Sequence, residues 1–484
     1  MREIKLVFLD EINCVFVGLT PKEIGYVRQK TKIFDQKAKQ TAAYKLGHDD
    51  GYRTFFDQEG YFFQWMIPTV IDLLEECGTP LDEVEFIDDR VANGLDLENM
   101  ETVNEFFLME ETGFSLRDSQ INAINAAINY RKGIISHATS AGKTFAMLGI
   151  AKAFDQRLKT ITVVPSEQLA SQTFEVYKKS DLNVLQLKAS IKGKKREEAF
   201  DLYDHIIITN KLLLNCLDFV EDKPFGLIVD EIHHYFGDCF TDAMQRQLSA
   251  CPVRIGLTGT MPQDKLKRER ILCHIGNKEI DTLKPKELID KKQAATLNIT
   301  MYTTIHDEAA EASKTSEWEW EHERMYLAAH TGRCQTIAEF IGNLDPVNTL
   351  VLGYANAVKI MADYFADDVI VDETPVSKRE EMVDRFDTMT DAIVFGSFNT
   401  VATGISKNKI YRVVIVDAGK NLTTVMQSIG RGLRIDNEKR HLEVIDISSD
   451  TKFSVNHRKE RKKIYKRESY PFADDEENII RIDE

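Results

Sequence analysis

The stretch Ser136-His137-Ala138-Thr139-Ser140-Ala141-Gly142-Lys143-Thr144 decides the expected fold. Residues 133–135 before it predict a short buried strand, and residues 145–151 after it predict a helix. A strand, a tight loop ending in Gly-Lys-Thr and a helix form the setting in which such a loop binds phosphate. His137 stands where these loops usually have their first glycine, and we expect it to be a loop residue rather than a catalyst. The alternative for this motif alone is a strand–turn–helix without a ligand.

The loop supplies groups that suit a nucleoside triphosphate and its metal ion. Gly142 lets the backbone approach phosphate oxygens, and N–H groups of the loop and the helix start point at the anion. Lys143 supplies a cation for the outer phosphates, and the Thr144 hydroxyl is a ligand for Mg²⁺. We therefore expect ATP and Mg²⁺ as cofactors. The loop residues expected to bind ATP are Thr139, Ser140, Ala141, Gly142, Lys143 and Thr144.

Length, composition and charge indicate a folded protein of several domains. The 484 residues correspond to about three domains. A content of 43% hydrophobic and 29% charged residues is typical of a folded soluble protein. The net charge of −16 argues against a nucleic-acid-binding surface over the whole molecule but allows a local basic groove. No apolar run approaches the ~20 residues that span a bilayer, so we expect no membrane partner.

The cysteines and the N-terminal residues favour a cytoplasmic protein. The seven cysteines are scattered without a Cys-x-x-Cys pair, and we interpret them as reduced thiols. Cys239 stands near His233 and His234, but no fourth ligand is nearby, which gives a zinc site little support. Two acidic residues interrupt the apolar pattern after residues 6–9, so we expect no signal peptide.

Strand and helix patterns divide the chain into four expected domains. The second and third contain continuous apolar strands separated by helical segments, which predicts parallel sheets covered on both faces. The first is a small α+β domain, and the fourth is a basic helix with an acidic tail. We expect an acidic surface helix and linker over residues 82–105, and a charged helical connector over residues 300–345. The expected domains are residues 1–107, 108–295, 296–455 and 456–484.

The first domain carries basic residues among aromatic ones. This pattern suits a nucleic-acid surface, and we expect the domain to bind DNA. A solvated basic face over an aromatic core fits the pattern about equally well. The basic run 457–467 near the C-terminus likewise fits either a nucleic-acid contact or a solvated charged face. The residues of the first domain are Lys22, Arg28, Lys30, Lys32, Lys37, Lys39, Lys45 and Arg53, with Tyr26, Phe34, Tyr44 and Tyr52 between them.

A pair of carboxylates follows a second apolar stretch in the domain of the phosphate loop. Asp230 and Glu231 come directly after residues 227–229, which predict a buried strand. The carboxyl end of a strand is where ligands bind in open α/β sheets. We expect Asp230 to hold Mg²⁺, and Glu231 to orient or deprotonate the water that attacks the γ-phosphate.

Two arginines in the third domain suit the charge that develops during phosphoryl transfer. Arg431 and Arg434 are three residues apart, which predicts that they share one helical face. A guanidinium that reaches the transferred phosphate acts as an arginine finger. We therefore expect these arginines, with Gln427 beside them, to complete an ATP site on the preceding domain. A surface helix is the alternative for this stretch alone.

Three further stretches suit nucleotide or nucleic acid. Gln120, after Arg117, has the paired donor and acceptor that can contact an adenine edge, although a structural role is the stronger alternative for this residue alone. Residues 396–406 form a polar loop that suits nucleotide and nucleic-acid backbone. Thr-Gly-Thr at residues 258–260 suits a coupling role between domains, and the alternative is an ordinary turn.

In this order the motifs resemble those of the superfamily 2 helicases and translocases. The matching stretches are Gln120 and residues 138–144, 164–172, 230–233, 258–260, 402–406 and 427–434. The resemblance implies an α/β fold class with two tandem RecA-like domains, parallel sheets and ATP hydrolysis stimulated by DNA or RNA. It also implies ATP contacts from Arg117, Gln120 and Gly404. The residues expected to contact nucleic-acid backbone are Pro165, Ser166, Thr209, Asn210, Lys211, Ser397, Thr400 and Thr403.

Details of the motifs narrow this resemblance. Thr-Gly-Thr is more similar to the recombination and repair branch than to the Asp-Glu-Ala-Asp RNA helicases. Together with the Asp-Asp-Gly turn at residues 49–51, Thr-Ser-Ala-Gly-Lys at residues 139–143 is similar to phage branch-migration helicases of the UvsW type. That family implies a DNA helicase that unwinds forks and Holliday junctions in an infected bacterium. We expect a monomer on DNA that grips the backbone without reading sequence. The alternatives are a duplex translocase of a restriction-type system, an RNA helicase and a non-catalytic nucleotide-switched clamp.

Overall fold

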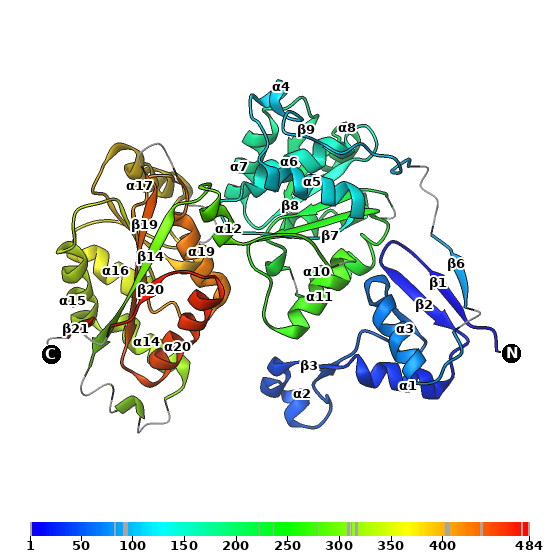
Figure 1. The fold of residues 1–484 in the computed structure, drawn as a ribbon, viewed down its shortest axis with the longest axis horizontal. Coiled ribbons are helices and arrows are strands. Elements are labelled where there is room, and N and C mark those ends of the chain that lie inside the picture. Colours follow the sequence, from blue (N-terminus) through cyan, green and yellow to red (C-terminus); the bar gives the residue numbers. More distant parts are fainter. Residues whose placement is uncertain are drawn as a thin grey trace. The chain divides into compact units, whose positions relative to one another are not determined.

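The computed structural model divides into two compact units, and its elements are labelled in Figure 1. The first unit comprises Met1–His137 and Gly142–Thr282, and the second comprises Ala138–Ala141 and Leu283–Glu484. The structure describes residues 2–81, 84–90, 95–221, 223–235, 237–276, 278–306, 310, 312–314, 318–401, 407–435, 439–475 and 478–482.

A mixed four-stranded sheet begins the first unit. Its order is β5-β2-β1-β6, with β1 antiparallel to β2 and parallel to β6. Helices α1 and α3 pack against this sheet through Val27 and Val70, which join Leu6 and Phe16 in a buried core. The bounds are β1 (Lys5–Phe8), β2 (Asn13–Val17), α1 (Pro21–Lys30), β5 (Tyr61–Phe63), α3 (Ile67–Glu76) and β6 (Glu85–Asp88). The expected surface helix over residues 82–105 is therefore wrong at β6, because pairing with β1 is a tertiary contact that local pattern does not reveal.

A small aromatic cluster lies between α1 and β5. The ring of Phe34 contacts those of Tyr44 and Tyr52 edge-on, at centroid distances of 5.9 and 5.2 Å. Lys32 and Lys39 place their ammonium groups over Tyr52 and Phe34. Tyr52 remains 46% exposed, so the aromatics form a local core and also present a ring to solvent. The elements are β3 (Ile33–Phe34), α2 (Ala42–Lys45) and β4 (Tyr52–Arg53).

A seven-stranded sheet of order β13-β7-β12-β11-β8-β10-β9 forms the rest of the first unit. The pairs from β7 to β9 are parallel, and strands β8, β10 and β11 are buried along their whole length. The strands are β7 (Lys132–His137), β8 (Thr160–Val164), β9 (Val184–Gln186), β10 (His205–Thr209), β11 (Gly226–Val229), β12 (Val253–Thr258) and β13 (Glu279–Leu283). The helices are α4 (Met109–Thr112), α5 (Asp118–Tyr130), α6 (Lys143–Phe154), α7 (Glu167–Tyr177), α8 (Lys194–Leu202), α9 (Asn210–Leu213), α10 (Asp238–Gln245) and α11 (Lys265–Ile275).

The second unit contains a second parallel sheet, of order β16-β17-β15-β18-β19-β14-β20, with β21 also paired to β14. The strands are β14 (Thr296–Ile305), β15 (Thr349–Gly353), β16 (Val369–Ile370), β17 (Ile393–Ser397), β18 (Arg412–Val416), β19 (His441–Ser449), β20 (Phe472–Ala473) and β21 (Ile479–Arg481). The helical connector expected over residues 300–345 is wrong in its first part, because these residues belong to strand β14. Its nine-residue register with β19 places it inside the sheet, although the two strands are far apart in sequence.

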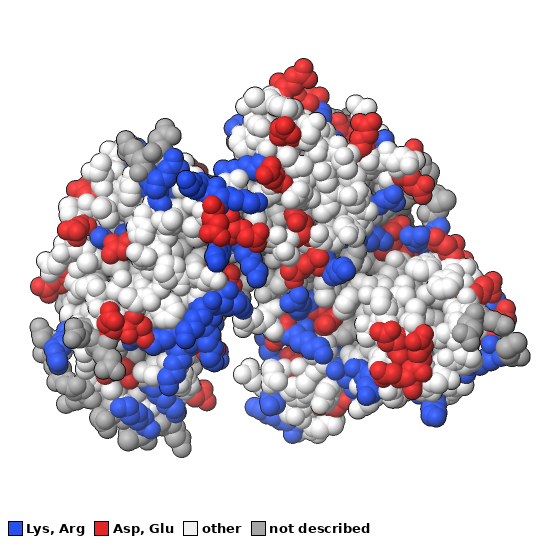
Figure 2. Space-filling view, in the orientation of Figure 1, with Lys and Arg blue, Asp and Glu red and all other residues white. Residues whose placement is uncertain are grey.

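Helices complete the second unit. They are α12 (Pro285–Asp290), α14 (Trp320–Ala329), α15 (Thr331–Gly342), α16 (Ala355–Tyr364), α17 (Val376–Thr388), α18 (Phe398–Val401), α19 (Leu422–Gly432) and α20 (Lys452–Arg467). Figure 2 shows lysine and arginine side chains gathered in a band over α20. Among the described residues, no helix combines the length and apolar character needed to cross a membrane.

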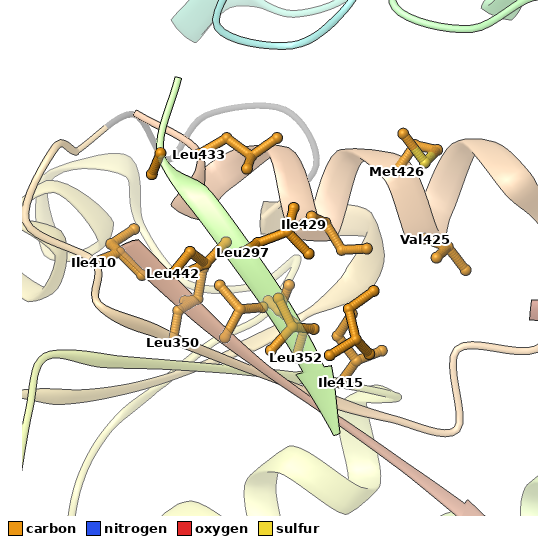
Figure 3. Packing of buried hydrophobic residues seen from close by; sticks show 14 of the residues in the cluster. Leu297, Leu350, Leu352, Ile410, Ile415, Val425, Met426, Ile429, Leu433 and Leu442 are labelled. Carbon is orange, nitrogen blue, oxygen red and sulfur yellow. The ribbon is translucent and has the colours of Figure 1, made fainter. Parts of the chain in front are cut away.

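The core of the second unit fixes α19 against the sheet. Val425, Met426, Ile429 and the following Leu433 belong to one buried cluster with the sheet. Figure 3 shows Val425 and Ile429 facing side chains of β14, β15, β18 and β19, with Met426 on the other side of the helix. The predicted fold class, two tandem RecA-like α/β domains with a small α+β N-terminal domain, is confirmed.

Candidate nucleotide and nucleic-acid site

The phosphate loop has a backbone that requires glycine at one position. Gly142 is the residue before α6 and has φ of 81° and ψ of 38°. This left-handed conformation is readily adopted by glycine and is strained for most other residues. A Cβ at Gly142 would also lie 2.4 Å from Nε2 of Gln120. Ser140, with φ of 74°, is a second left-handed residue of the same loop.

Gln120 is held directly against the loop. It is 1% exposed, its Nε2 donates to the carbonyl oxygen of Gly142 at 3.2 Å, and its Oε1 accepts from the backbone N–H of Arg117 at 2.9 Å. An amide has two donor hydrogens and two acceptor lone pairs, so one of each is left for an adenine edge. The structural role is thus observed, and adenine contact by Gln120 and Arg117 stays a prediction.

The sheet brings Lys143, Asp230 and Glu231 to one edge. Strands β7 and β11 flank β12 in parallel, so the residues after them lie at the same carboxyl edge. Nζ of Lys143 lies 3.9 Å from Oε1 of Glu231 and donates to the carbonyl oxygen of His137 at 3.3 Å. Asp230 is buried and accepts from the backbone N–H of Glu231 at 2.9 Å.

The donor set at this edge fits Mg²⁺. The Asp230 carboxylate and the Thr144 hydroxyl at the start of α6 are hard oxygen ligands of the type Mg²⁺ prefers. Burial and then the neighbouring Glu231 carboxylate raise the pKa of Asp230 to about 7, while the Lys143 ammonium acts in the opposite direction. A divalent cation would stabilise the ionised form, so binding of Mg²⁺ would be coupled to loss of the Asp230 proton.

A hydrogen bond connects His233, which lies beside Glu231, to Thr258 at the end of β12. Nδ1 of His233 lies 2.8 Å from Oγ1 of Thr258 and 3.3 Å from Oε2 of Glu231. The Thr258 hydroxyl donates to the carbonyl oxygen of Thr260 and accepts from its N–H. Because the hydroxyl gives its one hydrogen to Thr260, the network assigns the ring hydrogen of His233 to Nδ1. Burial lowers the pKa of His233 to about 4, so the ring is neutral at pH 7.

Sequence reasoning missed this role of His233. In the sequence, the residue stands out only through its motif and through a weakly supported zinc site. Its position two residues after Glu231 is the one signal that local sequence offers. Its partner Thr258 is 25 residues away and becomes a neighbour only because β11 and β12 pair.

The expectation that His137 is a loop residue is wrong. His137 is the last residue of β7 rather than a loop residue, and it is 1% exposed. Its Nε2 lies 2.7 Å from Oδ2 of Asp281 on the adjacent strand β13. The strand continues to this position because β13 supplies a partner for a buried imidazole.

The arginine motif lies on and just beyond α19. Gln427 and Arg431 are one helical turn apart and half-buried, on positions that alternate with the sheet-facing residues. The helix ends at Gly432, so the expectation that Arg434 shares its helical face is wrong. The buried Lys439 ammonium donates to the carbonyl oxygens of Gly432 and Arg434, which places a cation at the negative end of the helix dipole.

Part of the phosphate loop packs within the second unit. Ala138–Ala141 belong to that unit, and Oγ of Ser140 donates to the carbonyl oxygen of Gly430 at 3.4 Å. A Cβ at Gly430 would lie 2.5 Å from Cβ of Thr139. Because Gly430 has no side chain, this loop segment can pack directly against α19 at that position.

The predicted nucleic-acid residues of the first unit follow neighbouring strands. Pro165 and Ser166 come after β8, and Ser166 caps α7 by accepting from a backbone N–H of its first turn. Thr209 ends the adjacent strand β10, with Asn210 half-buried and Lys211 exposed after it. Because β8 and β10 are parallel, these residues share the carboxyl edge at which Asp230 lies.

The predicted nucleic-acid residues of the second unit are less accessible to solvent. Ser397 and Thr400 are buried, with their hydroxyl oxygens 2.8 Å apart, and Thr400 also donates to Asp372. Their contact with nucleic acid stays a prediction that requires a rearranged loop. Thr403 and Gly404 lie outside the described residues, as does the whole 402–406 motif.

Two family models match the chain. The model described as Type III restriction enzyme, res subunit, matches residues 113–263, and the model described as Helicase conserved C-terminal domain matches residues 349–436. Their order along the chain is that of the two parallel-sheet regions. Together the two matches indicate a helicase of superfamily 2.

Named relatives resemble parts of this chain. The DNA 3'-5' translocase XPB2 of Sulfurisphaera tokodaii is 32% identical over 154 residues, which is 32% of this chain and 33% of the relative. The DNA 3'-5' helicase XPB of Kineococcus radiotolerans is 23% identical over 322 residues, covering 65% of this chain and 54% of the relative. The chain thus spans between a third and about half of these two relatives. The crystal structure of T4 UvsW aligns over 99% of both chains, with 15% identity and a TM-score of 0.46.

Proposed function

We propose that this protein is an ATP-dependent DNA helicase or translocase that remodels forks and branched DNA, including Holliday junctions, in recombination, repair and replication restart. The observation that carries the proposal is the meeting of Lys143, Asp230 and Glu231 at one sheet edge. These residues supply a phosphate cation, a metal carboxylate and a carboxylate that orients water, which are the parts that ATP hydrolysis requires.

ATP binding exchanges contacts that already exist in the protein. In the structure, the Lys143 ammonium lies near Glu231 and the carbonyl oxygen of His137. Phosphate oxygens would draw Lys143 away and leave the Glu231 carboxylate to orient the attacking water. Bound Mg²⁺ would neutralise phosphate charge from the side of Thr144 and Asp230. Arg431 and Arg434, with Gln427, would stabilise the charge that develops on the transferred group.

The relay through His233 offers a route from hydrolysis to movement. Glu231 would sense the γ-phosphate, and His233 lies 3.3 Å from its carboxylate and contacts Thr258, the last residue of β12, which is hydrogen-bonded to Thr260. Loss of the γ-phosphate would change the charge next to His233 and shift the segment after β12. Repeated closure and opening of the two RecA-like domains would step the protein, as a monomer, along a DNA backbone.

The test is strand release from a labelled DNA fork. Wild type should release the strand with ATP, whereas Lys143→Ala and Glu231→Gln should lose release by about 100-fold or more. Glu175→Gln changes an exposed glutamate on α7 and is the matched control. Equal release by wild type and both site variants would refute the proposal, and stimulation of ATP turnover by RNA but not DNA would replace it with an RNA helicase.

A duplex translocase is the second candidate, favoured by the restriction-type family match and by the translocase named among the relatives. Such an enzyme would move along DNA without separating its strands. Displacement of the third strand of a DNA triplex, without release of a fork strand, would favour it.

A further inference from the structure

Helix α20 carries a straight row of exposed lysines. Its sequence KFSVNHRKERKKIYKR has a single acidic residue, Glu460, in a chain of net charge −16. Lys452, Lys459 and Lys466 are exposed and follow one another at intervals of seven residues. Seven residues make almost two helical turns, so the three ammonium groups point from the same side of the helix. Figure 2 shows a band of basic side chains over this helix.

Buried polar contacts fix the opposite side of α20. Arg461 is 1% exposed and donates through Nε and Nη2 to the two carboxylate oxygens of Asp446, each at 2.8 Å. Tyr465 donates to the same carboxylate at 2.7 Å, and Arg461 also donates to the carbonyl oxygen of Gly419 at 2.8 Å. A two-pronged contact of this kind sets the rotation of the helix about its axis. The lysine row therefore has one fixed outward direction.

Among the described residues, carboxylates pair with other basic residues of α20 but not with the row. The pairs are Lys463 with Glu460, Arg467 with Glu468, and both Arg458 and Lys462 with Asp474. Within the described part of the chain, no carboxylate forms an ion pair with Lys452, Lys459 or Lys466. A row of uncompensated cations on a fixed surface is costly through mutual repulsion, which a polyanion would relieve.

Neighbouring groups respond to the same positive field. Burial, and then the charges of Arg458, Lys466 and Lys459, lower the pKa of Lys462. Lys420, exposed on the loop after β18, lies close enough to act on the charges of His457 and Glu460. The basic surface thus extends from α20 to the carboxyl edge of the second sheet.

We infer that Lys452, Lys459 and Lys466, together with Lys420, bind the phosphate backbone of a DNA duplex without reading its sequence. The inference rests on the proposed function and adds the kind of DNA that this surface holds. From Lys452 to Lys466 the row is about 21 Å long at 1.5 Å per residue, which corresponds to about six base pairs. A straight and rigid row suits a duplex, which is itself stiff over this length, better than a flexible single strand.

The test is the salt dependence of DNA binding by the full chain without nucleotide. Lys452, Lys459 and Lys466 are changed together to Gln, and in the matched control together to Arg. For a duplex, three lost phosphate contacts should reduce the slope of log affinity against log salt by about 2.7. The ratio of wild-type to Gln-variant affinity should then fall about 40-fold between 50 and 200 mM salt. The Arg variant should keep the wild-type slope.

Three other results would bear on the interpretation of this surface. An unchanged slope in the Gln variant, with melting temperatures equal for all three proteins, would overturn the inference. A slope change for a single strand but not for a duplex would also overturn it, because the partner would then be a strand. Failure of wild type to hydrolyse ATP with DNA, while the duplex slope still depends on the lysines, would remove the motor and leave this surface in place.

Discussion

Asp230 illustrates how neighbours set the chemistry of one residue. Its carboxyl group follows a fully buried strand, beside Glu231 and opposite Lys143. Glu231 itself adopts φ of 49°, a left-handed conformation that is strained for a residue with a Cβ. The strain turns the second carboxylate toward Lys143 and His233 while the first stays buried. Two adjacent carboxylates can therefore take different roles, one toward the metal and one toward water.

Asp230→Asn should remove a pH dependence of stability. A pKa of about 7 lies above the value of about 4 in an unfolded chain, so the folded protein binds this proton more tightly. The stabilisation is full below pH 4 and is lost as pH rises through 7, by a few kcal/mol. We expect the melting temperature of ligand-free wild type to fall from pH 5 to pH 8, and that of the variant to fall less.

Thermal denaturation of wild type, Asp230→Asn and the exposed control Asp201→Asn across this pH range checks the prediction. The control should follow wild type at every pH. Parallel curves for all three proteins would mean that the Asp230 proton is not bound more tightly in the folded state. In wild type, Mg²⁺ affinity should rise over the same range, because the metal requires the ionised carboxylate.

At the scale of the element, α19 shows how a helix presents chemistry by burying its other side. Ile429 and Leu433 pack against the sheet, while Gln427 and Arg431 occupy other helical positions and stay half-buried. Gly432 ends the helix, and the Lys439 ammonium donates to its carbonyl oxygen. The position of Arg434 is therefore set by the turn after the helix and not by helical spacing from Arg431.

Arg431→Ala and Arg434→Ala should each lower kcat about 1000-fold or more and change the affinity for ATP only a few-fold. The physical reason is that a finger arginine contacts charge that develops in the transition state. Arg431→Lys keeps the charge but loses the planar fork, and it should recover only part of the rate. DNA-stimulated turnover and nucleotide binding, measured separately, check this prediction. An unchanged kcat would remove the finger assignment.

At the scale of the whole chain, the N-terminal sheet is joined to the seven-stranded sheet within the first unit. Lys132 at the start of β7 pairs with Glu11 at 2.7 Å, and the indole of Trp65 donates to Sγ of Cys273. Leu97 and Val103 pack in the core around α5 and α6. A domain boundary at residue 107 remains a proposal, and point variants test the N-terminal domain with less disturbance than a deletion there.

Tyr52→Ala should weaken binding to branched DNA by about 5-fold or more, since base stacking on an aromatic ring contributes about 1–3 kcal/mol. Tyr61→Ala is the matched control, because Tyr61 is 47% exposed and Tyr52 is 46% exposed in the same domain. Fluorescence anisotropy with a labelled four-way junction measures both. Equal affinities for the two variants would indicate that the aromatic cluster serves only the local core.

Sequence pattern predicted the two parallel sheets well, because their strands are continuous apolar runs and their helices are amphipathic. It placed Gly142 and Lys143 where the loop meets α6 and Asp230 directly after β11, since each motif stands at the end of a predicted element. It was wrong where a strand depends on a distant partner, as for β6 beside β1 and β14 beside β19.

By itself, the sequence determined the order of strand, phosphate loop and helix, and the chemical type of the groups at each strand end. Local periodicity and residue chemistry are sufficient for that. Only the tertiary structure decided that His233 meets Thr258, that His137 is buried against Asp281, and that the lysines of α20 face outward. These relations depend on which strands become neighbours and which helix face is anchored, and such long-range choices are made by packing of the whole core.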